Sequence, residues 1–259
     1  MSTSLQLKSV RLRVADLDRS VAFYAGQIGF SVLSTKPGEA TIAAYRDGPP
    51  FRHLIEDRAA PPSNPRSAGL FHVALLLPSR AALGRWLRAA TDAGTEFDGF
   101  SDHGVSEAIY LSDPEGNGLE FYYDRPRSAW PYQNGQLAMG TAPLDVSGLL
   151  AAGASHSSAP LTNAAWGHLH LRVTDPDRSA DYYTRELGLS LTQRFGANAR
   201  FLAVDGYHHH LGLNNWGGIR EPRRDGSLGM IEATFAKKGE PVERMLTDSD
   251  HLSIRIVPL

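Results

Sequence analysis

Two residues whose side chains can bind a metal lie within apolar stretches of the sequence. His72 falls in residues 70–78, LFHVALLLP, a run typical of a mostly buried strand that ends at a proline. Glu120 lies in a second apolar stretch, LEF. A buried carboxylate is costly unless a cation or donor compensates it, and a buried imidazole is expected to be neutral and to have a partner. The two residues therefore predict a metal site that needs one more ligand.

After the strand that contains His72, a helix and three strands are expected, and the last of these strands contains Glu120. Ser79 can cap a helix over residues 80–93, and Gly94 can end it. The last two strands are expected at about 107–111 and 118–123. They are joined by DPEGNG, which is rich in hairpin-turn residues. The unit reads as a strand, a helix and then three strands.

Composition limits the class of protein. The chain has 259 residues, 42% of them hydrophobic, a formal net charge of −2 and no cysteine. This is room for one large domain or two smaller ones, and the charge balance gives no reason to expect binding to nucleic acid or to a membrane. Without cysteine, a metal site must use His, Asp or Glu. The N-terminus lacks an apolar signal segment, so a cytoplasmic protein is expected.

The sequence contains an internal duplication. Residues 10–30, VRLRVADLDRSVAFYAGQIGF, match residues 169–189, LHLRVTDPDRSADYYTRELGL, at a constant offset of 159. Each copy predicts a strand, a helix that Asp16 or Asp175 can cap, and a glycine turn into another strand.

With the unit around His72, the chain divides into four modules. They span residues 8–58, 69–124, 166–217 and 227–259.

Two tandem domains follow from these modules. We expect a first domain over residues 1–125, a linker over 126–165 and a second domain over 166–259, each domain with two modules. The last module is abbreviated, with room for only a short helix that begins near Pro241.

The modules resemble a known superfamily. The opening LRVxDLDRSxxFY and the closing DPEGNGLEFY are similar to those of the vicinal oxygen chelate (glyoxalase/bleomycin resistance/dioxygenase) superfamily. The segments SDHGVSEAIYLSDPEGNGLE, YYDRPRSAWP and GYHHHLGLNNW resemble, more narrowly, CatE-type catechol 2,3-dioxygenases. The resemblance implies an α+β fold of four βαβββ modules in two tandem domains, with mixed sheets curved into cups.

In this superfamily the metal ligands come from the first and last strands of paired modules. In the second module these positions are His72 and Glu120, and in the third the first-strand position is His168. The resemblance therefore implies one metal site, built by modules two and three, with His72, His168 and Glu120 as ligands.

The corresponding positions of the other two modules are poor ligands. They fall at Ser9 in the first module and near Met230 and Arg255 in the fourth. We expect the cup formed by these modules to be metal-free and mainly structural.

Residues 207–213, YHHHLGL, are expected to form the last strand of the third module. The resemblance places a catalytic histidine at His209, whereas strand alternation would put His208 and His210 together on one face. The choice among the three stays open at this point.

Further polar residues are candidates for the site. The resemblance places a catalytic histidine at His103 and a catalytic tyrosine at Tyr110. His170 lies two residues from His168 on the same strand face and would either pack there or contact the substrate.

The resemblance implies a non-haem Fe(II) extradiol dioxygenase, with Mn(II) as the alternative metal and O2 as co-substrate. It would cleave a catechol, a small aromatic diol, to a hydroxymuconate semialdehyde, as in aromatic hydrocarbon catabolism. The alternatives are a glyoxalase-like metal-dependent isomerase or lyase, and a non-catalytic protein that binds an aromatic ligand. The ring substituents and the presence of a homo-oligomer are left open by the sequence.

Overall fold

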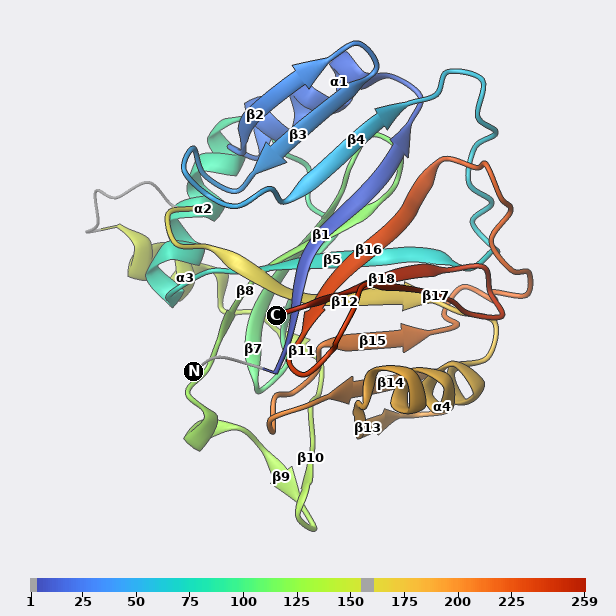
Figure 1. Ribbon diagram of the computed structural model, residues 1–259. Helices are drawn as coiled ribbons and strands as arrows, with labels where there is room; N and C mark the ends of the chain where they lie inside the picture. Colours follow the sequence, from blue (N-terminus) through green and yellow to red (C-terminus); the bar gives the residue numbers. More distant parts are fainter. Residues whose placement is uncertain (1–3, 155–160) are drawn as a thin grey trace.

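The computed structural model describes residues 4–154 and 161–259 and contains two large mixed sheets curled into half-barrels (Figure 1). The seven-stranded sheet has, in order, β17 (Arg244–Thr247), β18 (Ser253–Pro258), β16 (Gly229–Lys237), β1 (Leu5–Val14), β4 (Arg52–Glu56), β3 (Glu39–Ala43) and β2 (Ser31–Lys36). The nine-stranded sheet has, in order, β11 (Ala142–Pro143), β6 (Gly99–Asp102), β7 (Ser106–Ser112), β8 (Gly118–Asp124), β5 (Gly69–Leu76), β12 (Ala165–Arg172), β15 (Leu211–Asn214), β14 (Ala199–Ala203) and β13 (Ser190–Phe195). The α+β fold with curved mixed sheets is as predicted.

Each sheet joins one module from the first half of the chain to one from the second half. In the seven-stranded sheet, β1 pairs antiparallel with β16, and in the nine-stranded sheet β5 pairs antiparallel with β12. Figure 1 shows this mixing where the blue β1 lies beside the red-orange β16 and the teal β5 beside the yellow β12. The predicted pairing of module two with module three is confirmed. The domain limits at residues 125 and 166 stay a prediction.

The two helix caps predicted at Ser79 and Asp175 are present in the structure. Ser79 accepts a hydrogen bond from the backbone N–H of Ala82 at the start of α2 (Arg80–Asp92). Asp175 likewise caps α4 (Pro176–Leu187), which ends at Gly188 in the left-handed conformation.

The first copy of the duplicated segment begins in the same way and then departs from α-helical geometry. The Asp16 side chain accepts from the backbone N–H of Arg19 and caps α1 (Leu17–Val21). A π-helical segment, η1 (Ala22–Gln27), then follows. The cap thus fixes the start of the helix in both copies, and the two copies differ in how the helix continues.

The link over residues 126–165 carries structure of its own. It contains η2 (Arg127–Ala129), the β9–β10 hairpin (Tyr132–Gln133 and Gln136–Leu137), β11 and α3 (Val146–Gly153). Strand β11 extends the nine-stranded sheet by pairing with β6, and α3 packs against α2. The link is therefore part of the wall around module two.

Two expectations about elements were wrong. The helix expected near Pro241 does not form, because Gly239 turns the chain with φ of 79° and the next residues enter β17, which pairs with β18. The last strand of module three begins at Leu211 rather than at residue 207. The three histidines therefore precede that strand, and the alternation rule does not apply to them.

Two equivalent tyrosines link the two sheets. The hydroxyl of Tyr24, in module one, donates to Asp113 Oδ2 in the β7–β8 turn at 2.6 Å, and Tyr183, in module three, donates to Asp248 Oδ2 in the β17–β18 turn at 2.7 Å. Tyr24 also accepts a hydrogen bond from the fully buried Arg52. Burial raises the pKa of both tyrosines well above the ordinary value, so both stay protonated and donate.

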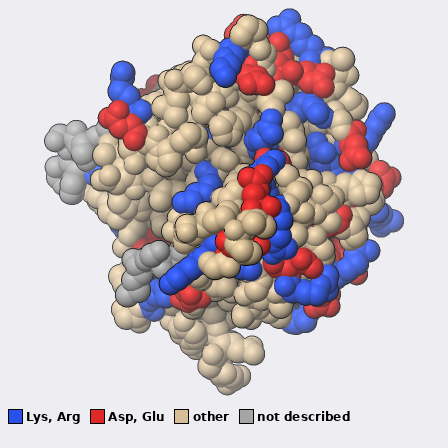
Figure 2. Space-filling model, viewed as in Figure 1, with Lys and Arg blue, Asp and Glu red and all other residues tan. Residues whose placement is uncertain are grey.

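The surface gives no sign of a polyanion-binding face in the view of Figure 2. Lys and Arg are interspersed with Asp and Glu there, without a large field of one sign. Among the described residues, no helix combines the length and apolarity that crossing a membrane requires.

We expect Tyr24→Phe to lower the free energy of unfolding by about 1–3 kcal/mol, because it leaves the buried Asp113 and Arg52 without a shared partner. Chemical denaturation monitored by circular dichroism measures this. Tyr132→Phe is the matched control, since Tyr132 is 58% exposed and should tolerate the change. Equal unfolding midpoints for the two variants would contradict the role of Tyr24.

Candidate metal centre

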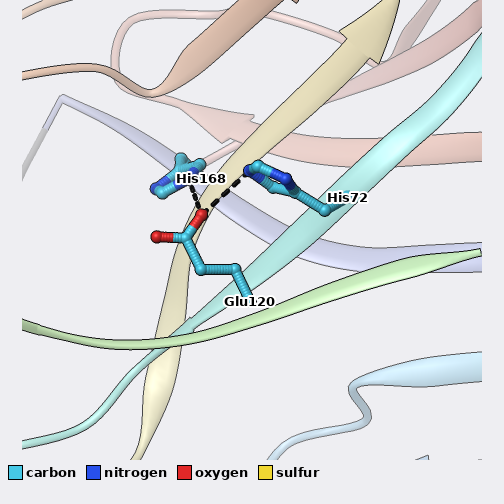
Figure 3. Close-up of side chains that lie close together, drawn as sticks. All are labelled: His72, Glu120 and His168. Carbon is cyan, nitrogen blue, oxygen red and sulfur yellow. Dashed lines mark hydrogen bonds and ion pairs between the residues drawn. The ribbon is translucent and has the colours of Figure 1, made fainter. Parts of the chain in front are cut away.

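Three adjacent strands each contribute one buried side chain to a common point. Glu120 lies on β8, His72 on β5 and His168 on β12. Figure 3 shows both imidazoles directed at the carboxylate: His72 Nε2 lies 2.9 Å and His168 Nε2 3.0 Å from Glu120 Oε2. The three ligand atoms all lie within 4.8 Å of one another. The structure thus brings together the residues proposed from the sequence, and their role as ligands stays a prediction.

The geometry of the three side chains suits a divalent metal ion. Two ligands at right angles on an ion with bonds of roughly 2.1 Å are about 3 Å apart, which matches the two separations above. His72 Nε2, although close to Glu120, makes no hydrogen bond and is buried without a partner. A buried polar atom needs a partner, and two imidazoles with one carboxylate form a donor set for borderline divalent ions. The residues present therefore fit a metal.

The protonation states also suit metal binding. Burial raises the pKa of Glu120, but His168 and His72 more than offset this effect and hold the pKa well below the ordinary value. Burial lowers the pKa of His168 to about 4. Near neutral pH, Glu120 is therefore a carboxylate and His168 is neutral, and a metal ion would displace only the Nε2 hydrogen that His168 donates to Glu120.

A cavity of about 250 Å³ opens beside these residues. Its apolar wall consists of Phe71, Met139, Phe195, Phe201 and Trp216. Its polar lining consists of His72, Ser101, His103, Ser106, Tyr110, Glu120, Thr141, His170 and His209. None of the lining residues is a lysine or arginine, so the cavity offers no such cation to an anionic ligand.

His103 and Tyr110 both line the cavity and contact each other. Tyr110 pairs across the strands with Glu120, and its hydroxyl lies 2.6 Å from His103 Nε2. His103 Nδ1 lies 2.7 Å from the Gly140 carbonyl oxygen, to which it donates, so Nε2 accepts from Tyr110. Burial, and then the Glu120 charge, raise the pKa of Tyr110 well above the ordinary value. Tyr110 therefore stays a hydrogen-bond donor, and the catalytic role of the pair stays a prediction.

Of the three consecutive histidines, His209 lines the cavity. Its ring centroid lies 4.0 Å from that of His168. His208 lies behind it, with the two Nδ1 atoms 2.7 Å apart, and His210 faces a different groove beside Tyr207. The residue indicated by the resemblance thus lies at the cavity, whereas the alternation argument was wrong about His208 and His210. The catalytic role of His209 stays a prediction.

His170 both packs and faces the cavity. Its Nε2 accepts a hydrogen bond from Asn214 Nδ2 at 3.0 Å. Its ring lies against Gly212, where an added Cβ would come within 2.8 Å of it. Position 212 therefore requires glycine if His170 is to keep this place.

The seven-stranded sheet has an ion pair near the corresponding position. Arg255 donates to both oxygens of Glu232, at 2.9 and 3.0 Å. Ser9 pairs with Thr234 on the neighbouring strand, and Met230 is buried. The expectation that this cup is structural and metal-free stays a prediction.

Several cavity residues were not identified from the sequence. Met139 and Thr141 come from the link, and no sequence signal marks them. Phe71 precedes His72 in the apolar run, and Trp216 closes the segment GYHHHLGLNNW, so proximity to known candidates would have found both.

The sequence pattern of the Glyoxalase/Bleomycin resistance protein/Dioxygenase superfamily matches residues 6–121 and 165–232. The chain belongs to this superfamily. It is 39% identical over 217 residues to a catechol-2,3-dioxygenase of Bacillus subtilis (strain 168), an alignment that covers 82% of this chain and 75% of that protein.

Two solved structures share the fold at low sequence identity. Glyoxalase I from Zea mays superposes with a TM-score of 0.59 at 16% identity, covering 98% of this chain and 92% of that one. The cppA protein from Streptococcus pneumoniae TIGR4 gives 0.58 at 8% identity, covering 100% and 99%. These likenesses concern the fold alone.

We expect the protein to bind one divalent ion per chain, and His72→Ala, Glu120→Ala and His168→Ala each to reduce the bound metal to background, because two ligands hold an ion poorly. Elemental analysis after dialysis measures the content. His251→Ala is the control, since His251 is an exposed histidine outside the cavity. Full metal content in any of the three variants would remove that residue from the ligand set.

We expect the stability of the metal-free protein to fall as the pH drops from about 7 to about 4. Burial lowers the pKa of His168 and His210 to about 4 and those of His170 and His209 well below the ordinary value. The unfolded chain, with histidine pKa values of about 6.5, then binds more protons than the folded chain.

Each such proton contributes a slope of about 1.4 kcal/mol per pH unit within that window. Denaturation at a series of pH values measures the slope. His210→Gln removes one of these protons and should reduce the slope by up to about 1.4 kcal/mol per pH unit. A stability that does not change between pH 7 and pH 5 would contradict this expectation.

Proposed function

We propose that this protein is an extradiol ring-cleaving dioxygenase that acts on catechols. The observation that carries the proposal is the convergence of His72, His168 and Glu120 beside a cavity with aromatic walls. The identity to a catechol-2,3-dioxygenase supports it. We propose Fe(II) as the metal, with Mn(II) as the alternative, O2 as co-substrate and a hydroxymuconate semialdehyde as product.

The donor set supports this reaction class. Two imidazoles and one carboxylate on one side of an ion leave open positions, as in non-haem Fe(II) oxygenases. A metal held by His72, His168 and Glu120 would supply the Lewis acidity that lowers the pKa of a catechol hydroxyl and would allow the diol to react with O2. The residues of the chain then bind and orient the substrate and transfer its protons.

The cavity wall supports a flat, neutral substrate. Phe71, Phe201 and Trp216 offer ring faces and edges against which an aromatic ring can pack. Because no lysine or arginine lines the cavity, a carboxylate on the ring would lack a charged partner. We therefore propose catechols with hydrogen or an uncharged apolar substituent as substrates.

Three further residues would act on the substrate. Tyr110, whose hydroxyl donates to His103, would accept a hydrogen bond from a substrate hydroxyl and so orient the substrate. His209, on the wall beside His168, would take a proton from the substrate and return it during ring opening.

The test is anaerobic loading with Fe(II), followed by addition of catechol and air. We expect consumption of one O2 per catechol and a product that mass spectrometry identifies as the semialdehyde. A catechol with a ring carboxylate should react more slowly, by a factor on the order of 10 or more, because each unpaired buried charge costs at least about 1.4 kcal/mol.

The control for this test is His72→Ala loaded in the same way, which should consume no O2. A metal-loaded protein that consumes no O2 with a panel of catechols would refute the proposal. Isomerisation of a substrate without O2 uptake would instead favour a glyoxalase-like reaction.

A further inference from the structure

A hydrogen-bonded row of side chains lies behind His209. Asp124, the last residue of β8, has Oδ1 2.9 Å from His208 Nε2. His208 Nδ1 lies 2.7 Å from His209 Nδ1. The His208 side chain is fully buried, whereas that of Asp124 is 22% exposed. The row thus leads from the cavity wall to a carboxylate at the edge of solvent.

The direction of the first hydrogen bond follows from the donors around Asp124. Tyr207 donates its hydroxyl to Asp124 Oδ2 at 2.9 Å, and Tyr122 lies 2.7 Å from Tyr207. Burial raises the pKa of both tyrosines well above the ordinary value, so both keep their protons. An ionised carboxylate only accepts hydrogen bonds, so the His208 Nε2–H group donates to Asp124.

With His208 neutral, the second hydrogen bond has one arrangement. Two nitrogens 2.7 Å apart need one hydrogen between them, and a neutral His208 that donates from Nε2 has no hydrogen on Nδ1. The hydrogen is therefore on His209 Nδ1. A neutral His209 with its hydrogen on Nδ1 keeps its lone pair on Nε2, the ring nitrogen that does not face His208.

We propose that Asp124 and His208 are positioning residues that fix the tautomer of His209, so that Nε2 presents a lone pair to the cavity. Its use in catalysis rests on the proposed function, because a lone pair there accepts a proton from a bound diol. The tautomer itself depends only on the hydrogen bonds of the protein.

A glycine in strand β12 leaves room for this row. A Cβ added at Gly167 would lie 2.0 Å from the Tyr122 hydroxyl, so any side chain there would displace Tyr122 and, through it, Tyr207. Glycine at position 167 thus allows the donors to remain beside Asp124.

Asp124→Asn tests the proposal because it should reverse the row. The amide oxygen would still accept from Tyr207, and the NH2 group would donate to His208 Nε2. His208 would then carry its hydrogen on Nδ1 and donate to His209 Nδ1, which leaves Nε2–H facing the cavity. A related substitution in serine proteases reverses a histidine tautomer and lowers kcat about 10⁴-fold.

The first measurement is the histidine ¹⁵N NMR spectrum of the metal-free protein at neutral pH, with His209 assigned from the signal lost in His209→Gln. We expect hydrogen on Nδ1 of His209 in the unchanged protein and on Nε2 in Asp124→Asn. Hydrogen on Nε2 in the unchanged protein overturns the proposal, and this result does not depend on whether the variant folds.

The second measurement is kinetic, on the Fe(II)-loaded protein. Asp124→Asn should lower kcat by a factor on the order of 10² to 10⁴, with KM and metal content nearly unchanged. Asp205→Asn is the control. Asp205 is exposed in the turn just before the three histidines, and its carboxylate accepts from Ser4 rather than from the histidines. Equal kcat values for the two variants overturn the positioning role.

The two measurements separate this inference from the proposed function. If the unchanged protein cleaves no catechol, the proposed function fails, and the NMR result alone still decides the tautomer.

Discussion

The antiparallel pairing of β5 with β12 is the interaction on which the candidate site depends. It places His170 opposite His72, and a register shift between Trp166 and Leu169 interrupts the ladder around His168. Each half of the chain carries only part of the candidate ligand set, since His72 and Glu120 belong to one half and His168 to the other. The backbone hydrogen bonds and the apolar residues of these two strands therefore complete the site as well as the sheet.

One face of β8 supplies two carboxylates, one that lines the cavity and one that lies behind its wall. Because side chains alternate along a strand, Glu120, Tyr122 and Asp124 share a face. Glu120 faces the two imidazoles, and Asp124 faces His208 behind the cavity wall. Burial lowers the pKa values of His168 and His209, which lie between these two carboxylates. The strand thus separates a position suited to a cation from one suited to a hydrogen-bond donor.

Features determined by neighbouring residues were predictable from the sequence, and features determined by packing were not. The side chains of Ser79 and Asp175 accept hydrogen bonds from backbone N–H groups two or three residues later, so their effect is local. His72 and Glu120 are marked by apolar neighbours in the sequence. The position of the three histidines depended on where β15 begins, which its pairing with β12 and β14 decides. Met139 reaches the cavity because the link packs there, and a residue that acts only through tertiary contact has no local signal.

The mixing of the two halves within each sheet affects how the chain folds during its synthesis. When the first half leaves the ribosome, β1 and β5 have no partners on the sides that β16 and β12 later occupy. Such apolar strands with free edges are prone to pair with other chains until their partners are synthesised. Residues as distant as Leu5 and Lys237 must meet to complete one sheet, so contact order is high and folding is expected to be slow. The arrangement that shares one site between two halves therefore also makes the nascent chain vulnerable to aggregation.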